Sequence, residues 1–452
     1  MTSSDQTSER SSIRQVVAAS FIGTTIEWYD FFLYGTAAAL VFNKLFFPKV
    51  EPSSGTLLAL ATYGVGFAAR PLGGIIFGHF GDRIGRKTML VLSLLIMGIA
   101  TFLIGLLPTY AAIGIWAPVI LVLLRIAQGI GVGGEWGGAV LMSVEHAPPG
   151  RRGFFGSWPQ MGVPAGLFLS TVVFLIVQET TSEEAFLSWG WRVPFLLSAV
   201  LIAVGLFVRL RLYESPAFQR VKDTGTEAPM PIMDVLRKYP REVLQAMGMR
   251  VAENGTFYIL TVYVLVYGTE ELELPKSTML WGVVIAALIG LVAIPYYGSL
   301  SDRVGRRPLY LGGALFSLVF AFPFFLLLNT KTALLIWLAI VLGVNVGHDL
   351  MYGPQAAYFA ELFGTRVRYS GASLGYQLAS VFAGGFAPLI AAALLKAWDW
   401  PAVAAYMALM AAITVVATWL TSETYQNEID ADDHREQELV SGKKEVTPEA
   451  RA

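Results

Sequence analysis

Ionisable side chains recur in the middle of long apolar stretches of this sequence. Glu27, Asp30 and Tyr34 are spaced by three and four residues, which places them on one face of a helix. Arg125 and Gln128 have the same spacing in another apolar stretch. A charge inside a lipid bilayer is costly unless it faces water or a partner, so such residues usually serve the passage of ions or solutes. Each of these groups is therefore a candidate for carrying a proton or binding a charged molecule.

The same pattern occurs twice more in the second half of the chain. These two stretches contain Arg250, Glu253, Asn254 and Phe257, and Asn345, His348, Asp349 and Tyr352, respectively. An imidazole titrates close to neutral pH, which makes His348 a candidate proton carrier. A guanidinium binds a carboxylate through a planar two-point fork, so Arg125 and Arg250 are candidates for binding an organic anion.

We expect these residues to surround one central hydrophilic cavity at mid-depth in the membrane. The residues expected to couple transport to protons are Asp30, Glu27, Glu135, Asp349 and His348. The residues expected to contact the substrate are Arg125, Gln128, Tyr34, Arg250, Glu253, Asn254, Asn345, Tyr352, Trp136 and Tyr376. An alternative interpretation is that these charges form buried ion pairs that only fix packing, such as Arg125 with a carboxylate of the first stretch.

The elements that position these residues must be transmembrane helices. Of the 452 residues, 55% are hydrophobic and 14% charged, whereas about a quarter are charged in a typical soluble domain. A helix of about 20 residues spans a hydrocarbon core about 30 Å thick, and backbone groups in lipid must be satisfied within the segment. Twelve apolar runs meet this length, at 16–41, 56–79, 88–107, 115–143, 153–177, 192–210, 243–268, 277–299, 308–328, 333–361, 369–395 and 400–421.

The twelve runs divide into two halves of six, which predicts an all-α integral membrane protein. We expect an N-terminal tail at 1–15, a first half at 16–210, a linker at 211–242, a second half at 243–421 and an acidic tail at 422–452. Lys and Arg concentrate in the loops on one side, so both termini and the linker are expected to be cytoplasmic.

A charged loop occurs at the same place in both halves. Residues 78–87 (GHFGDRIGRK) and 298–307 (GSLSDRVGRR) share a glycine, an Asp-Arg pair and a Gly-Arg pair. This repeat predicts two pseudo-symmetric copies of one membrane-embedded unit. Ion pairs at these loops and the neighbouring helix ends are expected to close the cytoplasmic side in one state. The expected gating residues are Asp82, Arg83, Arg86, Asp302, Arg303, Arg306, Glu145, Arg151, Glu361 and Arg366.

Both loops resemble the signature loop of the major facilitator superfamily. Within that superfamily, the chain resembles the metabolite:H+ symporter branch over nearly its whole length except the tails. The segments that carry this resemblance include GTTIEWYDFFLYG (23–35), ARPLGGIIFGHFGDRIGRK (69–87), RIAQGIGVGGEWGGA (125–139) and ELFGTRVRYSGAS (361–373). The resemblance implies the fold of that superfamily, and import of a small organic acid or zwitterion with protons across a bacterial inner membrane.

Other classes of protein fit the sequence poorly. It lacks the His-Glu-x-x-His, Walker and Gly-x-Ser-x-Gly patterns of enzymes, and it contains no cysteine for thiol chemistry or metal binding. A net charge of −1 disfavours nucleic acid as a partner, and a channel would need a filter or a ring of subunits. We therefore expect a monomeric carrier without catalytic residues, metal or cofactor, whose partners are its solute, protons and the bilayer.

The substrate remains open between an organic acid and a zwitterionic osmolyte such as proline or betaine. The two arginines favour an organic anion. Shikimate, with one carboxylate and three hydroxyls, would suit Arg125 together with Gln128, Tyr34, Asn254 and Asn345. An aliphatic dicarboxylate would instead engage both Arg125 and Arg250.

Overall fold

The computed structural model describes residues 13–84, 86–133, 136–145, 147–210, 235, 237, 239–363 and 368–426, and within them the regular elements are helices. The first half contains the long helices α1 (Ile13–Leu40), α3 (Pro52–Ile84), α4 (Arg86–Leu106), α6 (Trp116–Val132), α7 (Trp136–Glu145), α8 (Arg152–Thr180) and α11 (Ser198–Leu210). Shorter helical segments connect them, namely α2 (Phe42–Phe46), α5 (Tyr110–Ile113), α9 (Glu183–Ala185), η1 (Phe186–Gly190) and α10 (Arg192–Leu196).

The second half repeats this plan with more interruptions. It comprises α14 (Pro240–Tyr258), η2 (Ile259–Tyr263), α15 (Val264–Val266), η3 (Tyr267–Glu271), α16 (Lys276–Val304), α17 (Arg306–Leu328), α18 (Ala333–Val341), η4 (Leu342–His348), α19 (Asp349–Glu361), α20 (Arg368–Ala379), η5 (Ser380–Gly385), α21 (Ala387–Trp398) and α22 (Trp400–Leu420). Each of the twelve predicted runs falls on one helix or on consecutive helical segments, as predicted.

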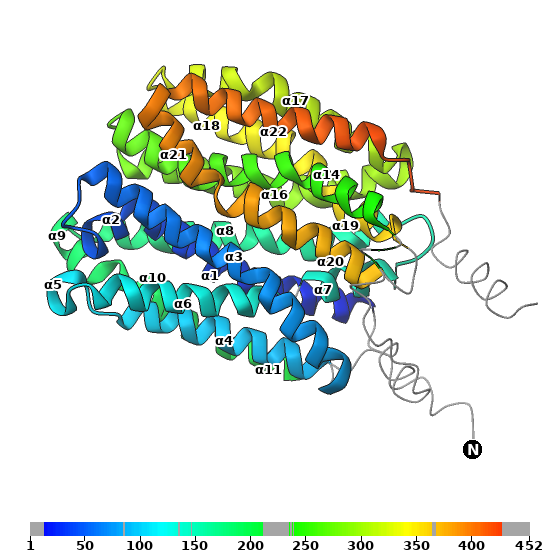
Figure 1. Cartoon of the computed structure of the whole chain (residues 1–452), viewed down its shortest axis with the longest axis horizontal. Helices are drawn as coiled ribbons and strands as arrows, with labels where there is room; N and C mark the ends of the chain where they lie inside the picture. The colour runs from blue at the N-terminus through cyan, green and yellow to red at the C-terminus, as the bar shows by residue number, and fades with distance from the viewer. Residues whose placement is uncertain are drawn as a thin grey trace, which may run out of the picture.

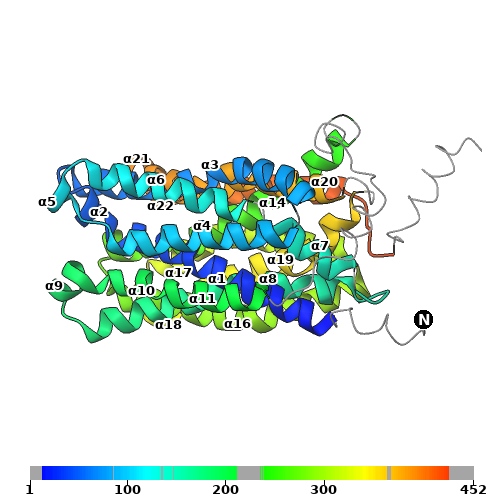
Figure 2. The same cartoon turned by 90° about the horizontal axis from the view of Figure 1, so that it is seen from below.

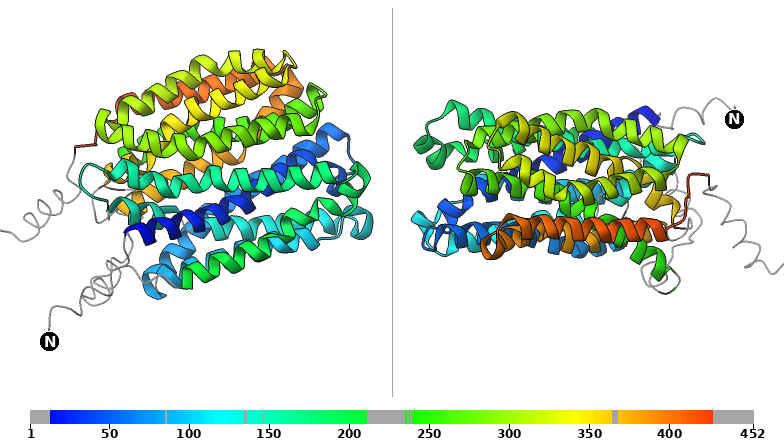
Figure 3. Two further views of the ribbon diagram at one scale, coloured as in Figure 1. Left: turned by 180° about the vertical axis from the view of Figure 1, so that it is seen from behind. Right: turned by 90° about the horizontal axis from the view of Figure 1, so that it is seen from above.

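The two halves lie side by side, with their helices running along the long axis of the molecule (Figure 1). The view from below shows the same bundle, with α2, α5 and α9 at one end and α7 and α20 towards the other (Figure 2). α8 packs along α1 within the first half and along α16 of the second half, as the view from behind also shows (Figure 3). The pair of α8 and α16 is thus a long seam between the halves.

Eight helices in the described part of the chain are long and apolar enough to cross a membrane by themselves. α14 is not among them because it carries Arg250, Glu253 and Asn254, which lower its hydropathy. The helix that departs most from the hydrophobic pattern is therefore one that carries predicted site residues.

π-helical segments interrupt three of the membrane-spanning helices of the second half. One of them, η4, contains Asn345 and His348. A π turn breaks the regular backbone ladder and is common at functional sites. The interruption in η4 therefore coincides with the polar residues predicted for the cavity.

Glycines allow α3 and α6 to cross at backbone contact. A Cβ at Gly129 would collide with the carbonyl of Gly66, and one at Gly133 would collide with the carbonyl of Arg70. Small residues permit this approach between membrane helices. The crossing fixes α3 and α6 relative to each other, and both helices contribute to the site described next.

Candidate substrate and proton site

α1 places Glu27, Asp30 and Tyr34 inside the protein, as their spacing predicts. Asp30 is 0% exposed, and neither of its carboxylate oxygens has a hydrogen-bond partner among the described residues. Thr101 on α4 lies beside it, but this hydroxyl already donates to a main-chain carbonyl and accepts from Gln128. Asp30 is thus a buried acid with little to stabilise its ionised form.

α6 directs the guanidinium of Arg125 into an aromatic cluster of the first half. Its Nη1 donates to Gln128 at 3.1 Å, and its Cζ lies 4.3 Å from the ring centroids of both Phe31 and Tyr34. Arg125 is fully buried, and no described carboxylate lies within ion-pair distance of it. The described residues therefore do not form the alternative ion pair between Arg125 and a carboxylate of α1.

A second buried arginine of the first half, Arg70 on α3, was missed by the sequence interpretation. It is 1% exposed, and its Cζ lies 4.3 Å from the ring centroid of Phe31 and 4.4 Å from that of Phe67. The signal was present, because Arg70 lies well inside the predicted span 56–79. It was overlooked because the motif around it was interpreted mainly through the charged loop that follows.

Five predicted residues of the second half come together in one buried network, namely Arg250, Glu253, Asn345, His348 and Asp349. His348 Nδ1 lies 2.8 Å from Asp349 Oδ1, and His348 Nε2 lies 3.3 Å from Glu253 Oε1. Asp349 also accepts a hydrogen bond from Asn345 at 2.7 Å. The other oxygen of Glu253 accepts from Arg250 Nη1 at 2.7 Å. The imidazole therefore bridges two carboxylates, and one of these holds the arginine.

Arg250 is engaged on several sides at once. Besides Glu253, it donates to Gln355 at 3.1 Å and to Ser380 at 3.0 Å, and its Cζ lies 3.2 Å from the ring centroid of Tyr376. Its charge is compensated within the protein. The two arginines singled out in the sequence thus differ, since Arg250 has a carboxylate partner and Arg125 has none among the described residues.

Trp136 and Tyr376, the expected walls of the cavity, stack on each other across the two halves with ring centroids 3.6 Å apart. The Trp136 indole donates to Gln160 at 3.0 Å, and Gln160 donates to the main-chain carbonyl of Tyr352 at 3.4 Å. Tyr352 in turn stacks on His348 at 4.8 Å. These contacts join the halves on the side of α7 and α20.

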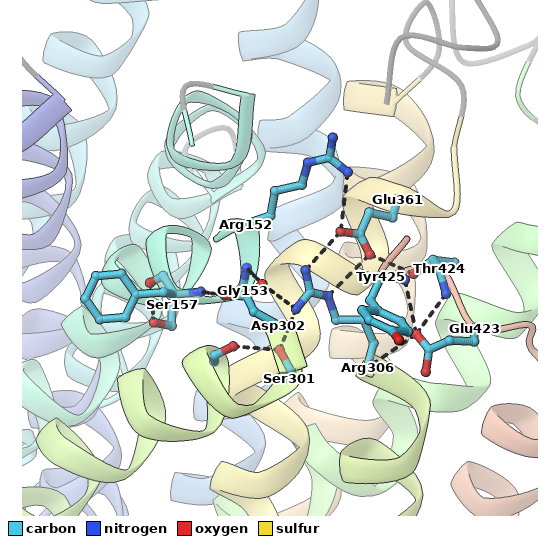
Figure 4. A network of polar contacts seen from close by, with 12 residues as sticks. Arg152, Gly153, Ser157, Ser301, Asp302, Arg306, Glu361, Glu423, Thr424 and Tyr425 are labelled. Atoms are coloured by element: carbon cyan, nitrogen blue, oxygen red, sulfur yellow. Dashed lines mark hydrogen bonds and ion pairs between the residues drawn. The ribbon is translucent and has the colours of Figure 1, made fainter. Parts of the chain in front are cut away.

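At that end of the bundle, the last turn of α16 contacts the first half directly (Figure 4). Asp302 accepts hydrogen bonds from the main-chain N–H groups of Gly153 and Phe154, at 2.8 and 2.9 Å. These groups begin α8, where the helix dipole favours a negative charge. Asp302 also pairs with Arg306 at 2.7 Å, and Arg306 pairs with Glu361 at 3.1 Å.

The other predicted gating residues have different surroundings. Arg303 and Arg151 are exposed, and the guanidinium of Arg151 lies over the rings of Phe154 and Phe155. The neighbouring Arg152 approaches Glu361, at 3.9 Å. Predicted residues that lie outside the described ones are Glu135 and Arg366, together with the side chains of Asp82, Arg83, Arg86 and Glu145.

The beginning of the C-terminal tail belongs to the same cluster and was not predicted to do so. Glu423 accepts hydrogen bonds from the main-chain N–H groups of Arg306 and Arg307, each at 3.0 Å, at the start of α17. Thr424 donates to Glu361 at 2.7 Å (Figure 4). The partners of Glu423 are backbone groups of a distant helix, and a sequence pattern does not predict such contacts.

The opposite end of the bundle is also joined across the halves. Thr56 on α3 donates to Glu270 on η3 at 2.7 Å, and Lys396 on α21 donates to Ser53 at 2.8 Å and to Glu51 at 3.4 Å. Burial raises the pKa of the Glu270 carboxyl above its ordinary value, although the bond from Thr56 partly offsets this. The halves therefore touch at both ends, with the buried charged residues between them.

A helical bundle in two halves, with ionisable groups buried between them, defines a membrane carrier that moves solutes rather than transforming them. Residues 20–384 match the Major Facilitator Superfamily, and the chain belongs to that family of transporters, which are not enzymes. It is 46% identical to the shikimate transporter of Escherichia coli K12 over 87% of this chain and 91% of that protein.

Two further relatives extend the comparison. The chain is 44% identical to the inner membrane metabolite transport protein YhjE of Escherichia coli K12, over 91% of this chain and 94% of that protein. It is 36% identical to the proline/betaine transporter of the same organism, over 92% of this chain and 84% of that protein. The chain is therefore a multi-pass membrane metabolite transporter.

Solved structures of the proton:xylose symporter XylE have the same fold. The form bound to 6-bromo-6-deoxy-D-glucose superimposes with a TM-score of 0.71, covering 91% of this chain and 96% of that one at 19% sequence identity. The predicted superfamily fold is thus confirmed.

Proposed function

We propose that this protein imports a small organic acid together with protons across the bacterial inner membrane, with both termini in the cytoplasm. The observation that carries this proposal is Arg125, a fully buried guanidinium that has no carboxylate partner among the described residues. A buried cation without a counter-ion is costly, and a substrate carboxylate can supply the missing charge. Arg250 is less suited to this role because Glu253 already neutralises it.

The likeness to the shikimate transporter supports a hydroxylated carboxylic acid as the substrate class. Hydroxyls need side-chain donors and acceptors, and Asn254 offers a buried side-chain oxygen without a partner among the described residues. Asn254 belongs to the second half, and Arg125 belongs to the first. A hydroxy acid held between them would contact both halves, as alternating access requires.

Asp30 is the proposed proton carrier. An ionised carboxylate with no hydrogen-bond donor in a buried site is strongly disfavoured, so this acid carries a proton while the site is closed. Exposure to water on one side of the membrane then permits its release. The network of His348, Asp349 and Glu253 already compensates its own charges, so we assign it the second place among the candidates.

Uptake into proteoliposomes tests the proposal. Labelled shikimate, succinate, proline and glycine betaine would each be offered with an inward proton gradient, and again with the gradient collapsed by a protonophore. We expect shikimate to accumulate above its external concentration only while the gradient exists. Accumulation that ignores the protonophore would refute proton coupling, and a protein that ignores both acids would refute the substrate class.

A zwitterionic osmolyte is the second candidate. The relation to the proline/betaine transporter supports it, as do the aromatic rings of Phe31, Tyr63, Phe67 and Tyr258, which lie together at the border between the halves. Aromatic faces bind quaternary ammonium groups. Accumulation of betaine rather than of an acid in the same experiment would select this alternative.

A further inference from the structure

We propose that Arg70 is a substrate-binding residue that holds the carboxylate of the solute together with Arg125. The inference deepens the proposed function, but it requires only that the transported solute carries a carboxylate. It therefore applies equally to an organic acid and to a zwitterion.

The first argument is the state of the N–H groups. Nε and Nη2 of Arg70 and Nε of Arg125 are buried and have no hydrogen-bond partner among the described residues. Leaving a buried donor unpaired is costly, and it is more costly for a charged group. Two neighbouring guanidinium groups with unused donors indicate an acceptor that comes and goes, and a substrate carboxylate is such an acceptor.

The second argument is distance. Both Cζ atoms lie 4.3 Å from the centroid of the same ring, that of Phe31, so they are at most twice that distance apart. A carboxylate bound by a guanidinium fork at N–O distances of about 2.8 Å has its carbon about 4 Å from Cζ. Two guanidinium groups can share one carboxylate when their Cζ atoms are up to about 8 Å apart, which covers nearly all of the range that the shared ring allows. The faces of Phe31 and Phe67 also stabilise the Arg70 cation.

The third argument is charge. Arg70 and Arg125 are both buried, and no described carboxylate lies within ion-pair distance of either, whereas Arg250 has Glu253. Two like charges in a medium of low polarity repel each other, and an anion between them removes this cost. The anion site is therefore placed in the first half, around Phe31, and not at the pair of Arg125 and Arg250.

The fourth argument is rigidity and connection. The carbonyl of Arg70 packs against Gly133, and the guanidinium of Arg125 fills the space beside Gly66, so the α3–α6 crossing holds the two arginines in fixed relation. Phe67, which lies beside Arg70, contacts the ring of Tyr258 in the second half, with centroids 5.0 Å apart. A solute bound at this site would therefore affect the packing of both halves.

The test compares Arg70→Lys and Arg70→Gln with Arg125→Lys and a control, Arg192→Lys. Arg192 is a partly buried arginine whose Nη1 donates to the carbonyls of Gly105 and Leu107, away from the site. In proteoliposomes with labelled shikimate, we expect KM to rise about tenfold in Arg70→Lys and Arg125→Lys, because a lysine has no planar fork. Arg192→Lys should stay within about twofold of wild type, since it keeps a cation beside the same carbonyls.

A second readout separates binding from structure. Inhibition of uptake by shikimate is compared with inhibition by its methyl ester, which lacks the negative charge. The wild type should prefer the acid, and Arg70→Gln should lose most of this preference while keeping the wild-type melting temperature in detergent. A folded Arg70→Gln protein with unchanged preference would overturn the inference. If Arg70→Gln does not fold, the preference of Arg70→Lys decides in the same way.

The outcome for Arg70 is distinguishable from the outcome for the proposed function. If the wild type takes up betaine instead of an acid, the proposed function fails, and the same variants are measured with betaine and its methyl ester. An unchanged preference would then refute the role of Arg70, and a lost preference would support it. A wild-type protein that transports none of these carboxylates would refute both.

Discussion

The buried charged residues of the two halves differ in whether they have partners. In the second half, Arg250, Glu253, His348 and Asp349 compensate one another within hydrogen-bonding distance. In the first half, Asp30 has no hydrogen-bond partner among the described residues. Groups without partners are those whose state changes when a ligand or a proton arrives, because nothing else stabilises them. The first half is therefore where we expect most of the substrate and proton chemistry.

Asp30→Asn should abolish uphill uptake and leave exchange intact. The amide cannot release a proton, so the variant lacks the coupled step but can still bind solute and change conformation. The measurement compares accumulation under a proton gradient with counterflow exchange of labelled solute at equal pH. Glu27→Gln is the companion variant on the same face of α1. If both variants still concentrate solute, the coupling group lies elsewhere, and Asp349 and His348 are next to be tested.

At the scale of elements, the crossing of α3 and α6 determines the geometry of the site. The glycines at this crossing bring backbone against backbone, so there is no flexible side chain to absorb an added atom. The positions of the arginines on these helices follow from that contact. The crossing should accordingly be among the least tolerant parts of the fold.

Gly129→Ala should destabilise the protein by about 1–3 kcal/mol, the usual cost of overpacking. The new Cβ would collide with the carbonyl of Gly66. Gly312→Ala on α17 is the matched control, because a Cβ there would lie 3.4 Å from a Leu350 side-chain atom, an ordinary contact. Melting temperatures of the detergent-solubilised proteins measure the difference. Equal stability of the two variants would show that the crossing has room to adjust.

The helices themselves could be predicted from the sequence, because length and hydropathy suffice for a segment in lipid. The clustering of His348, Asp349 and Asn345 with Glu253 could also be predicted, from their helical spacing and their position near the middle of the predicted spans. The π segment η4 was not predictable, since the hydropathy of a helix does not record its local winding. Its effect on which residues share a face could be seen only in the structure.

The sequence interpretation was less complete where partners come from distant segments or from the backbone. Asp302 was expected to form ion pairs that close one side, but the groups that donate to it across the halves are main-chain N–H groups at the start of α8. Glu423 likewise caps α17 from beyond the last helix. Spacing within one helix contains no information about such contacts, because they depend on how separate helices pack.

Asp302→Asn should slow transport about tenfold and leave the affinity for solute within a few-fold of wild type. The change removes the charge that faces Arg306 and the first turn of α8, which weakens closure at this end and shifts the population away from the closed state. Arg303→Gln, an exposed neighbour, is the control. Binding in detergent and uptake in vesicles would be measured for each variant. Normal uptake in Asp302→Asn, or loss of binding in a folded protein, would contradict this role.

For the whole molecule, contacts at both ends define a closed conformation, and we expect either side to open from it. The contact of Glu270 with Thr56 lies at the end opposite to Asp302. Burial raises the pKa of Glu270 in this closed state, so protonation and closure favour each other. Below the ordinary pKa of a glutamic acid, Glu270 is protonated in both the closed and the open state, and its contribution to closure is complete. This contribution is lost as the pH rises through the pKa that Glu270 has in the closed state.

The population with this end open should therefore grow as the pH rises through that window, and Glu270→Gln should remove the dependence. Spin labels at Leu58→Cys on α3 and Ile390→Cys on α21 report the opening as a distance, and the chain has no native cysteine to interfere. Distances would be measured over a pH series in detergent and in nanodiscs. A pH dependence that persists unchanged in Glu270→Gln would assign it to another group.

We expect the seam between α8 and α16 to act as the pivot for these movements. At the end of the seam near Asp302, a Cβ on Gly153 would collide with the carbonyl of Gly298, and a Cβ on Gly298 would come within 2.6 Å of the carbonyl of Gly153. Two rods in backbone contact can roll on each other but cannot be pressed closer. We expect rolling about this contact to separate the halves at the opposite end while the end near Asp302 stays closed. Opening of one side at a time would then follow from where the seam is in closest contact, without any signal passing between the ends.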